Sequence, residues 1–235
     1  MATRPVLSGI ETRSLRERVY ERLKLLMSEG RLRPGSNLDL NALAGEIGIS
    51  RTPLRDALIR LEAEGFAEIL PRRGVRIAEL TLGRIRDIYE MLGALESAAL
   101  RSVAVRITPG VVARMAELDA EMGRALDVFD FGRLYDANLA FHDAWLDLSE
   151  NAEMVRRIRI LKQRLYDFPR QQGFVPEWER TSIDEHEVMV GLLREGRIPE
   201  GADYLRDVHW SYAHQEPFIL RYYAALAGSS ARAES

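Results

Sequence analysis

Residues 49–58 have the sequence ISRTPLRDAL, and this stretch decides the fold of the N-terminal part of the chain. It predicts the start of a helix, because Ser50 stands where a hydroxyl can cap the first turn. Pro53 falls inside that turn, where its missing N–H costs little. Four apolar residues then recur at helical spacing on one stripe: Leu54, Ala57, Leu58 and Leu61.

Three polar residues lie on a separate flank of this predicted helix, roughly 120° from the apolar stripe. They are Arg51, Thr52 and Arg55, all near the N-terminal end. Arginine can form two hydrogen bonds with a guanine edge, and threonine can reach a phosphate or a base. An exposed arginine on a helix is more often only solvated, so the prediction of DNA contact depends on the neighbouring elements.

Those neighbouring elements are a short helix before the stretch and a hairpin after it. The short helix ends at Gly48, since glycine accepts the left-handed conformation of a helix C-terminus. Residues 66–70 and 75–78 predict two strands, and the turn between them contains Arg72, Arg73 and Gly74. Together these elements predict a winged helix-turn-helix, with Arg73 and Gly74 close to the DNA backbone or minor groove.

Composition restricts the class of protein further. The chain has 235 residues and no cysteine, which excludes disulfides and thiolate metal sites. The sequence has no long apolar run, and its first 14 residues have no apolar segment, so we expect no secretory leader and a cytoplasmic protein without membrane contact. The net charge is −3, but residues 1–78 contain 14 Lys and Arg against 10 Asp and Glu. A basic N-terminal part on an acidic body permits phosphate contact at one end.

The remainder of the chain predicts a helical bundle. Long amphipathic patterns cover residues 81–106, 109–127, 130–149, 152–168, 178–195 and 199–225. The predicted fold is therefore mostly α, with an N-terminal winged helix-turn-helix and a C-terminal six-helix antiparallel bundle. We expect the DNA-binding domain at 1–78, the helical domain at 79–226 and a short tail at 227–235.

All four histidines of the chain lie in the helical part: His142, His186, His209 and His214. Asn138 precedes His142 by four residues, so both share one helical face. Imidazoles from several helices with an oxygen donor suit a divalent transition metal. The spacing alone leaves the common alternative open, in which each histidine is a surface or core residue. Residues 186–190 begin like the zinc-protease motif but lack its second histidine, which excludes that motif.

Residues 19–78 resemble the DNA-binding domain of the GntR family of bacterial regulators. The matching segments are YERL at 20–23, GRLRPG at 30–35, LA at 43–44, ISRTPLRDAL at 49–58, LEAEG at 61–65 and RGV at 73–75. The resemblance implies that Arg51, Arg55 and Gly74 lie at the DNA. Asn41 stands where some members of the family have a further DNA-contacting arginine.

Residues 81–222 resemble the FCD ligand-binding domain of the FadR-type branch, in its VanR-like six-helix form. The matching residues are IYE at 88–90, LE at 95–96, NLAFH at 138–142, Asn151 and the run from His186 to His209. The resemblance implies a divalent metal, Zn or Ni, on Asn138, His142, His186 and His209. Asn138 replaces the commoner aspartate of the family, and we expect His214 on the surface.

The resemblance also implies a homodimeric repressor that binds palindromic double-stranded DNA and responds to a small-molecule effector, with an organic acid as one candidate. Leu92 stands where acid-sensing members have a carboxylate-binding arginine. Four other arginines could replace it, although surface ion pairs are the commoner use: Arg101, Arg133, Arg159 and Arg164. We expect no enzymatic activity.

Two alternatives to this prediction remain open. One is a metal-dependent hydrolase or lyase that uses the histidine cluster, with Glu90 and Asp143 as the generic acids. The other is a sensor with an apolar cavity and a structural metal.

Overall fold

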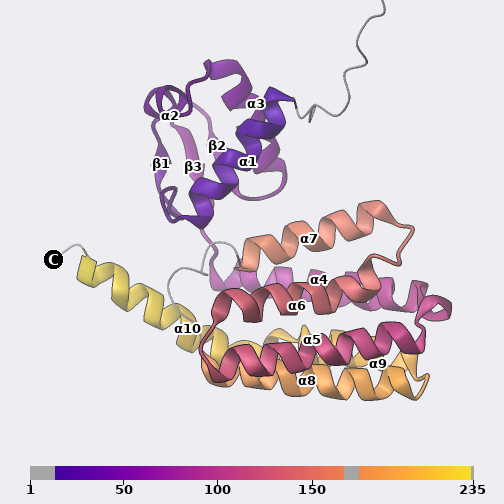
Figure 1. The fold of residues 1–235 in the computed structure, drawn as a ribbon. Coiled ribbons are helices and arrows are strands. Elements are labelled where there is room, and N and C mark those ends of the chain that lie inside the picture. The colour runs from indigo at the N-terminus through magenta and orange to yellow at the C-terminus, as the bar shows by residue number, and fades with distance from the viewer. Residues whose placement is uncertain (1–13, 167–174, 234–235) are drawn as a thin grey trace, which may run out of the picture. The chain divides into compact units, whose positions relative to one another are not determined.

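The chain forms two units in the computed structural model, Met1–Glu79 and Leu80–Ser235. The structure describes residues 14–166 and 175–233, with side chains given for 14–165 and 175–222. Helices dominate both units, and a small sheet accompanies those of the first unit (Figure 1). The predicted mostly α fold, an N-terminal winged helix followed by a helical domain, is therefore confirmed. None of the described helices is both long and apolar enough to cross a bilayer.

The first unit contains three helices and a three-stranded antiparallel sheet. In chain order these are α1 (Leu15–Ser28), β1 (Asn37–Leu38), α2 (Leu40–Ile47), α3 (Arg51–Ala63), β2 (Ala67–Leu70) and β3 (Gly74–Ile77). The strand order is β1-β3-β2, so the predicted hairpin gains an additional edge strand. The strand β1 has two residues, which is too short for any periodic pattern to indicate it.

The turn between α2 and α3 is built largely as its sequence predicts. Gly48 ends α2 in the left-handed region, at φ 74° and ψ 37°. Ser50 occupies the N-cap position of α3, but the prediction that its side chain caps the helix is wrong. Pro53 is the third residue of α3 and has no N–H, which removes one of the two donors that a capping hydroxyl uses.

Replacement of Gly48 by alanine is expected to destabilise the first unit by about 1 kcal/mol, because the left-handed region disfavours a Cβ. The space around a Cβ at Gly48 is open, so the effect isolates the backbone conformation. Gly45→Ala, inside α2 and equally uncrowded, is the matched control, with an expected stabilisation of about 0.5–1 kcal/mol. Urea unfolding followed by circular dichroism measures both. Equal stabilisation by the two replacements would contradict the assignment.

The second unit is a bundle of antiparallel helices around one large core. Its elements are α4 (Leu82–Ser102), a 3-10 turn (Ala104–Arg106), α5 (Pro109–Asp127), α6 (Phe131–Leu146), α7 (Ala152–Tyr166), α8 (Pro176–Arg194), α9 (Ile198–Tyr204), a π-helical turn (Leu205–His209) and α10 (Tyr212–Ala233). Helix α5 packs between α6 and α8, and α4 packs on α7 (Figure 1). Phe141 and Trp145 are fully buried at the centre. Residues 167–168 of the predicted fourth helix lie outside the described residues.

The last predicted helix, 199–225, is divided in the structure. A π-helical turn follows α9, and the Trp210 N–H donates to the Leu205 carbonyl, five residues earlier. The turn lies close against α4: a Cβ at Gly93 would be 3.3 Å from the Arg206 carbonyl and from Trp210 Cβ. This close approach places His209, the last residue of the turn, inside the bundle. Helix α10 then continues past the predicted end, to Ala233.

Candidate functional site

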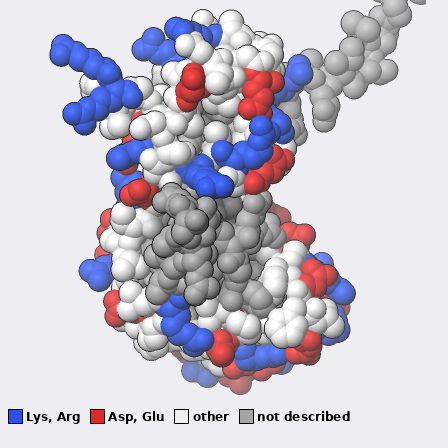
Figure 2. Space-filling view, turned by 90° about the vertical axis from the view of Figure 1, so that its left-hand side faces the viewer, with Lys and Arg blue, Asp and Glu red and all other residues white. Residues whose placement is uncertain are grey.

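The two faces of α3 are separated as the sequence predicts. Its apolar stripe is buried in the core of the first unit: Leu54, Ala57, Leu58 and Leu61. Arg51, Thr52 and Arg55 are exposed on the other flank. Figure 2 shows Lys and Arg side chains projecting from this unit. The flank is therefore free to contact a polyanion while the stripe fixes the helix in place.

Asn41 holds one of these arginines. The Arg51 Nη2 donates a hydrogen bond to Asn41 Oδ1, from the start of α3 to the start of α2. Asp39, the N-cap of α2, accepts from the N–H groups of Asn41 and Ala42. These backbone hydrogen bonds, helped by the charge of Arg51, hold the pKa of Asp39 below its ordinary value. The sequence did not predict this contact. Asn41 was considered only as the residue at a position where some members of the family have a DNA-contacting arginine.

The tip of the wing is exposed and basic. Arg72 and Arg73 lie in the turn between β2 and β3, and Gly74 begins β3. All three are exposed, and the Arg73 N–H closes the turn on the Leu70 carbonyl at 3.0 Å. The wing therefore offers two cations beside a glycine without a side chain to obstruct a backbone phosphate.

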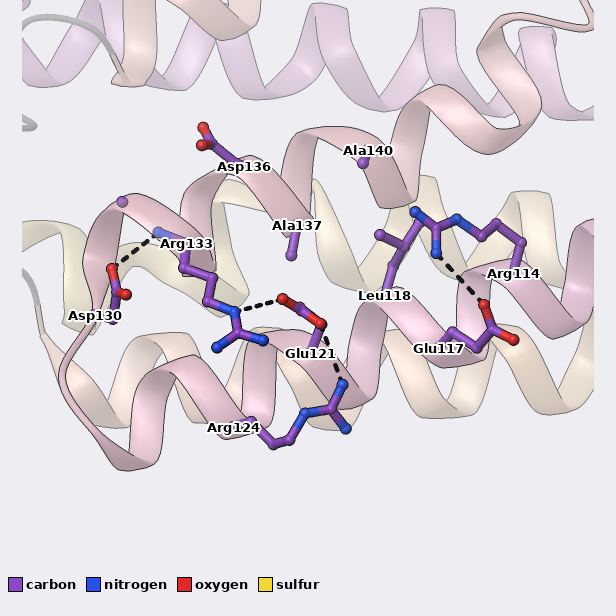
Figure 3. Close-up of a pocket in the computed structure, with 11 residues that line it drawn as sticks. Arg114, Glu117, Leu118, Glu121, Arg124, Asp130, Arg133, Asp136, Ala137 and Ala140 are labelled. Atoms are coloured by element: carbon purple, nitrogen blue, oxygen red, sulfur yellow. Dashed lines mark hydrogen bonds and ion pairs between the residues drawn. The ribbon is translucent and has the colours of Figure 1, made fainter.

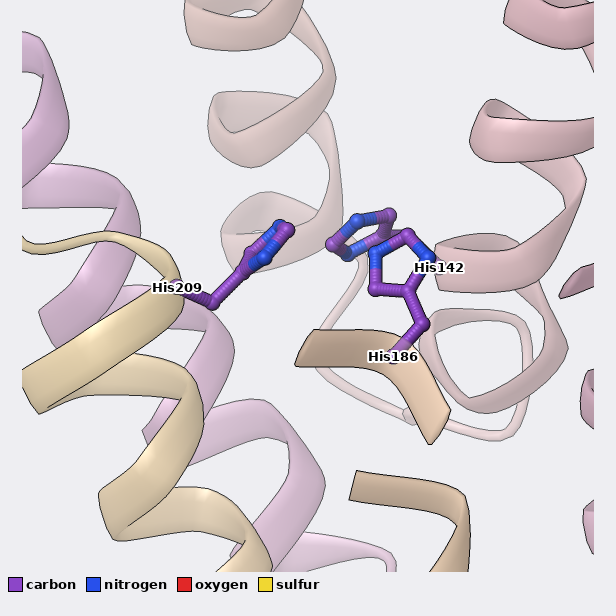
Figure 4. Close-up of side chains that lie close together, drawn as sticks. All are labelled: His142, His186 and His209. Carbon is purple, nitrogen blue, oxygen red and sulfur yellow. The ribbon is translucent and has the colours of Figure 1, made fainter. Parts of the chain in front are cut away.

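Three of the four histidines meet inside the second unit. His142 comes from α6, His186 from α8 and His209 from the π-helical turn, and all are buried (Figure 4). One ligand nitrogen from each lies within 4.8 Å of the others. Asn138 is also buried, one turn before His142 on α6. His214 is exposed and bonded to Ser211, which confirms the surface prediction.

Four buried polar atoms of this cluster lack a hydrogen-bond partner in the described structure. They are Asn138 Oδ1, His142 Nε2 and both ring nitrogens of His186. Burial lowers the pKa of His142 to about 3, against the pull of Glu96, and it lowers that of His186 well below its ordinary value. The imidazoles of His142 and His186 are therefore neutral, which is the form that ligates a metal. Buried, neutral and unpartnered donors of this kind fit a divalent metal such as Zn or Ni.

A carboxylate lies beside each of the three histidines. Glu96 Oε2 is 2.7 Å from His142 Nδ1, and Glu185 Oε2 is 2.8 Å from His209 Nδ1. Asp119 Oδ1 is 3.3 Å from His186 Nδ1, but the pair lacks hydrogen-bond geometry. Burial, with Glu187 and Asp184 nearby, raises the pKa of Asp119 to about 7. Sequence reasoning found none of these three, because they come from other helices and no periodic pattern relates them to the histidines.

The generic acids of the enzymatic alternative are placed elsewhere. Glu90 is exposed on α4. Asp143 forms an ion pair with Arg159 Nη2 at 3.2 Å. Neither carboxylate is thus placed as a free general base at the histidine cluster, as a metal-dependent hydrolase would require.

The arginines considered for an effector carboxylate form surface ion pairs. Arg101 pairs with Asp203 at 2.6 Å, Arg159 with Asp147 at 2.5 Å and Arg133 with Glu121. Leu92 is fully buried in the core. These contacts favour the ion-pair interpretation for three of the four arginines.

A hollow of about 840 Å³ lies on the surface along α5 and α6 (Figure 3). Its charged side chains pair with each other: Arg133 and Arg124 both reach Glu121, and Arg114 lies 3.4 Å from Glu117. The hollow is open, and its three arginines are paired with glutamates of the same lining, which is unlike the enclosed and mostly apolar pocket of a small-molecule site.

Comparison with known families agrees with both units. Residues 15–77 match the model of the bacterial regulatory proteins of the gntR family, and residues 87–209, more than half of the chain, match the FCD domain. The chain belongs to the GntR family, with an FCD domain. This GntR protein is thus a transcriptional regulator, and the families and relatives that it matches are regulators rather than enzymes.

Several relatives of this GntR protein support the assignment. The Nta operon transcriptional regulator of Aminobacter aminovorans is 28% identical over 175 residues, which cover 74% of this chain and 80% of the relative. An uncharacterised regulator of Streptomyces ambofaciens is 28% identical over 80% of this chain and 78% of its own. The solved structure of E. coli McbR/YncC shares the fold, with a TM-score of 0.67 at 24% identity over 91% of this chain and 99% of that one.

Proposed function

We propose that this GntR regulator is a homodimeric repressor of metabolic genes that binds a palindromic operator. The exposed flank of Arg51, Thr52 and Arg55 over a buried apolar stripe carries the proposal. In this proposal the N-terminal end of α3 enters the major groove, and Arg73 and Gly74 of the wing approach the backbone. Two copies related by a two-fold axis match two half-sites of a palindrome.

The helical unit holds the metal and the effector in this proposal. Asn138, His142, His186 and His209 bind Zn or Ni in this proposal. The convergence of the three buried histidines supports it, as do the unpartnered atoms of Asn138, His142 and His186. A small effector with oxygen donors, such as an organic acid, binds at the metal. The metal supplies a Lewis-acid anchor for that ligand. Effector binding then shifts the population between arrangements that bind DNA and arrangements that do not.

Binding of the purified protein to genomic fragments tests the proposed function. We expect a short palindromic footprint. Light scattering of the protein–DNA complex should show a dimer, and addition of the effector should release the protein from the DNA. The neighbouring genes then indicate the effector. Binding to every fragment alike, with no footprint at low or high salt, would overturn the repressor proposal.

Asn41→Ala is expected to weaken operator binding about threefold to tenfold, the size of one net hydrogen bond. Without Asn41 Oδ1, Arg51 loses the contact that orders its guanidinium before DNA arrives. Fluorescence anisotropy on the operator measures the effect, with a thermal melt to show that the fold is retained. Glu46→Ala is the control, because Glu46 is on the same helix as Asn41 and forms an exposed ion pair with Arg31. Its affinity should stay near that of the wild type. Equal affinities of all three proteins would contradict an orienting role of Asn41.

A further inference from the structure

Two buried carboxylates orient two of the histidines. Glu96 accepts from Nδ1 of His142 at 2.7 Å, and Glu185 accepts from Nδ1 of His209 at 2.8 Å. Since a carboxylate only accepts, Nδ1 carries the proton, and the lone pair of each ring lies on Nε2. This tautomer presents Nε2 to a metal, as carboxylate–histidine pairs do in metalloproteins.

The two carboxylates differ in what balances their charge. Glu96 Oε1 lies 2.7 Å from Lys162 Nζ, and the two side chains are 0% and 4% exposed. Burial alone would raise the pKa of Glu96, but His142 and Lys162 together hold it below its ordinary value. Glu96 and Lys162 therefore form a pair without net charge next to His142.

Glu185 has neutral partners instead. Its Oε1 accepts from Gln215 Nε2 at 2.9 Å, and the Gln215 Oε1 accepts from the Trp178 indole N–H at 2.8 Å. Gln215 also donates weakly to the His209 carbonyl, at 3.4 Å. This chain of hydrogen bonds from α8 and α10 fixes the carboxylate without cancelling its charge.

Lys162 places a positive charge close to the histidines. Its ammonium group lies 5.6 Å from the centre of the Trp210 ring, and its charge contributes to the lowered pKa values of His142 and His186. It is one of only two lysines among 33 basic residues. A buried cation at this range opposes the binding of a second cation, because charges interact strongly in a poorly screened interior.

We propose that Glu185 supplies the negative charge that the neutral Asn138 withholds from the metal, and that Lys162 weakens metal binding by neutralising Glu96. Glu185, held by Gln215 and Trp178, is then the positioning residue that sets metal affinity. Lys162 keeps that affinity low enough for the metal to exchange. The inference rests on the proposed metal site and deepens it, by assigning the residues that tune its affinity.

Competition for Zn²⁺ against a chromogenic chelator, with the metal-free full-length protein, tests the inference. Glu185→Gln is expected to weaken Zn²⁺ binding about tenfold to a hundredfold. Lys162→Met is expected to tighten it by about tenfold or more, because the uncompensated Glu96 then favours a cation. If Lys162 had a purely structural role, its replacement would weaken Zn²⁺ binding. A Zn²⁺ affinity of Lys162→Met at or below that of the wild type would therefore overturn the inference.

Paired and control variants keep the test decisive if Lys162→Met folds poorly. The paired variant Glu96→Gln, Lys162→Met removes both charges and leaves the net charge unchanged. We expect its Zn²⁺ affinity within about threefold of the wild type, because the remaining loss is smaller than one net hydrogen bond. Lys24→Met replaces the other lysine of the chain and should leave the Zn²⁺ affinity unchanged. Thermal melts of the metal-free proteins show whether each variant is folded. An affinity of the paired variant as low as that of Glu185→Gln would overturn the charge argument. Absence of Zn²⁺ and Ni²⁺ binding by the wild type would overturn the metal site itself, and with it this inference.

Discussion

The double variant Arg51→Ala, Arg55→Ala is expected to lose about 100-fold or more in operator affinity, since each good bidentate contact with a base is worth about 1–3 kcal/mol. Both side chains are exposed on the flank of α3, so their removal leaves the buried stripe intact. Anisotropy titrations on the operator and on a scrambled duplex measure the loss across salt concentrations.

The scrambled duplex separates base contacts from phosphate contacts. If the arginines contact bases, the affinity for the operator falls much more than the affinity for the scrambled duplex. Arg114→Ala with Arg157→Ala is the charge-matched control on the helical unit, where both arginines form exposed intramolecular pairs. Operator affinity of the α3 variant within threefold of the control variant would contradict the proposed role of the flank.

Local pattern was sufficient to predict the helix-turn-helix. The apolar stripe of α3 and the left-handed Gly48 depend on residues that lie close together in the sequence, at most three positions from one member of the stripe to the next. Such features follow from helical geometry and backbone sterics. The missing cap at Ser50 is also a local feature, because Pro53 removes one of the two N–H donors that a capping hydroxyl uses.

The histidine site could be predicted only in part. The rarity of histidine in this chain drew attention to the four residues, all in one domain, and the resemblance to the FCD domain implied which three of them bind the metal. Their carboxylate partners are 46 and 24 positions away, for Glu96 with His142 and for Glu185 with His209. Contacts over such separations depend on tertiary packing, which hydrophobic periodicity does not encode.

The π-helical turn at Leu205–His209 illustrates the same limit. The sequence of the turn continues the helical pattern of its neighbours, and this pattern predicted one uninterrupted helix over 199–225. The turn places His209 against α4, through the close approach at Gly93. Turns of this kind are frequent at functional sites. The division of the last helix thus depends on what the turn packs against rather than on its own residues.

The double variant His142→Ala, His186→Ala is expected to lose stoichiometric Zn²⁺ or Ni²⁺ binding and the stabilisation that the metal gives. A metal at 100 times its dissociation constant stabilises the folded protein by about 2.7 kcal/mol. For a unit of this size, that corresponds to a melting-temperature increase of roughly 5–10 °C. Differential scanning calorimetry with and without metal measures the increment, and elemental analysis measures the metal content.

The increment, rather than the absolute melting temperature, is the quantity that decides this prediction. His186 stacks on Phe141, with ring centres 3.9 Å apart, so its removal also costs packing in the metal-free protein. His214→Ala is the matched control, because His214 is exposed and outside the cluster, and it should keep the full increment. An unchanged increment and metal content in the double variant would show that the metal binds elsewhere. Loss of both, with the His214 variant unaffected, would place the metal on the buried cluster, where among the described residues three imidazoles from separate elements converge.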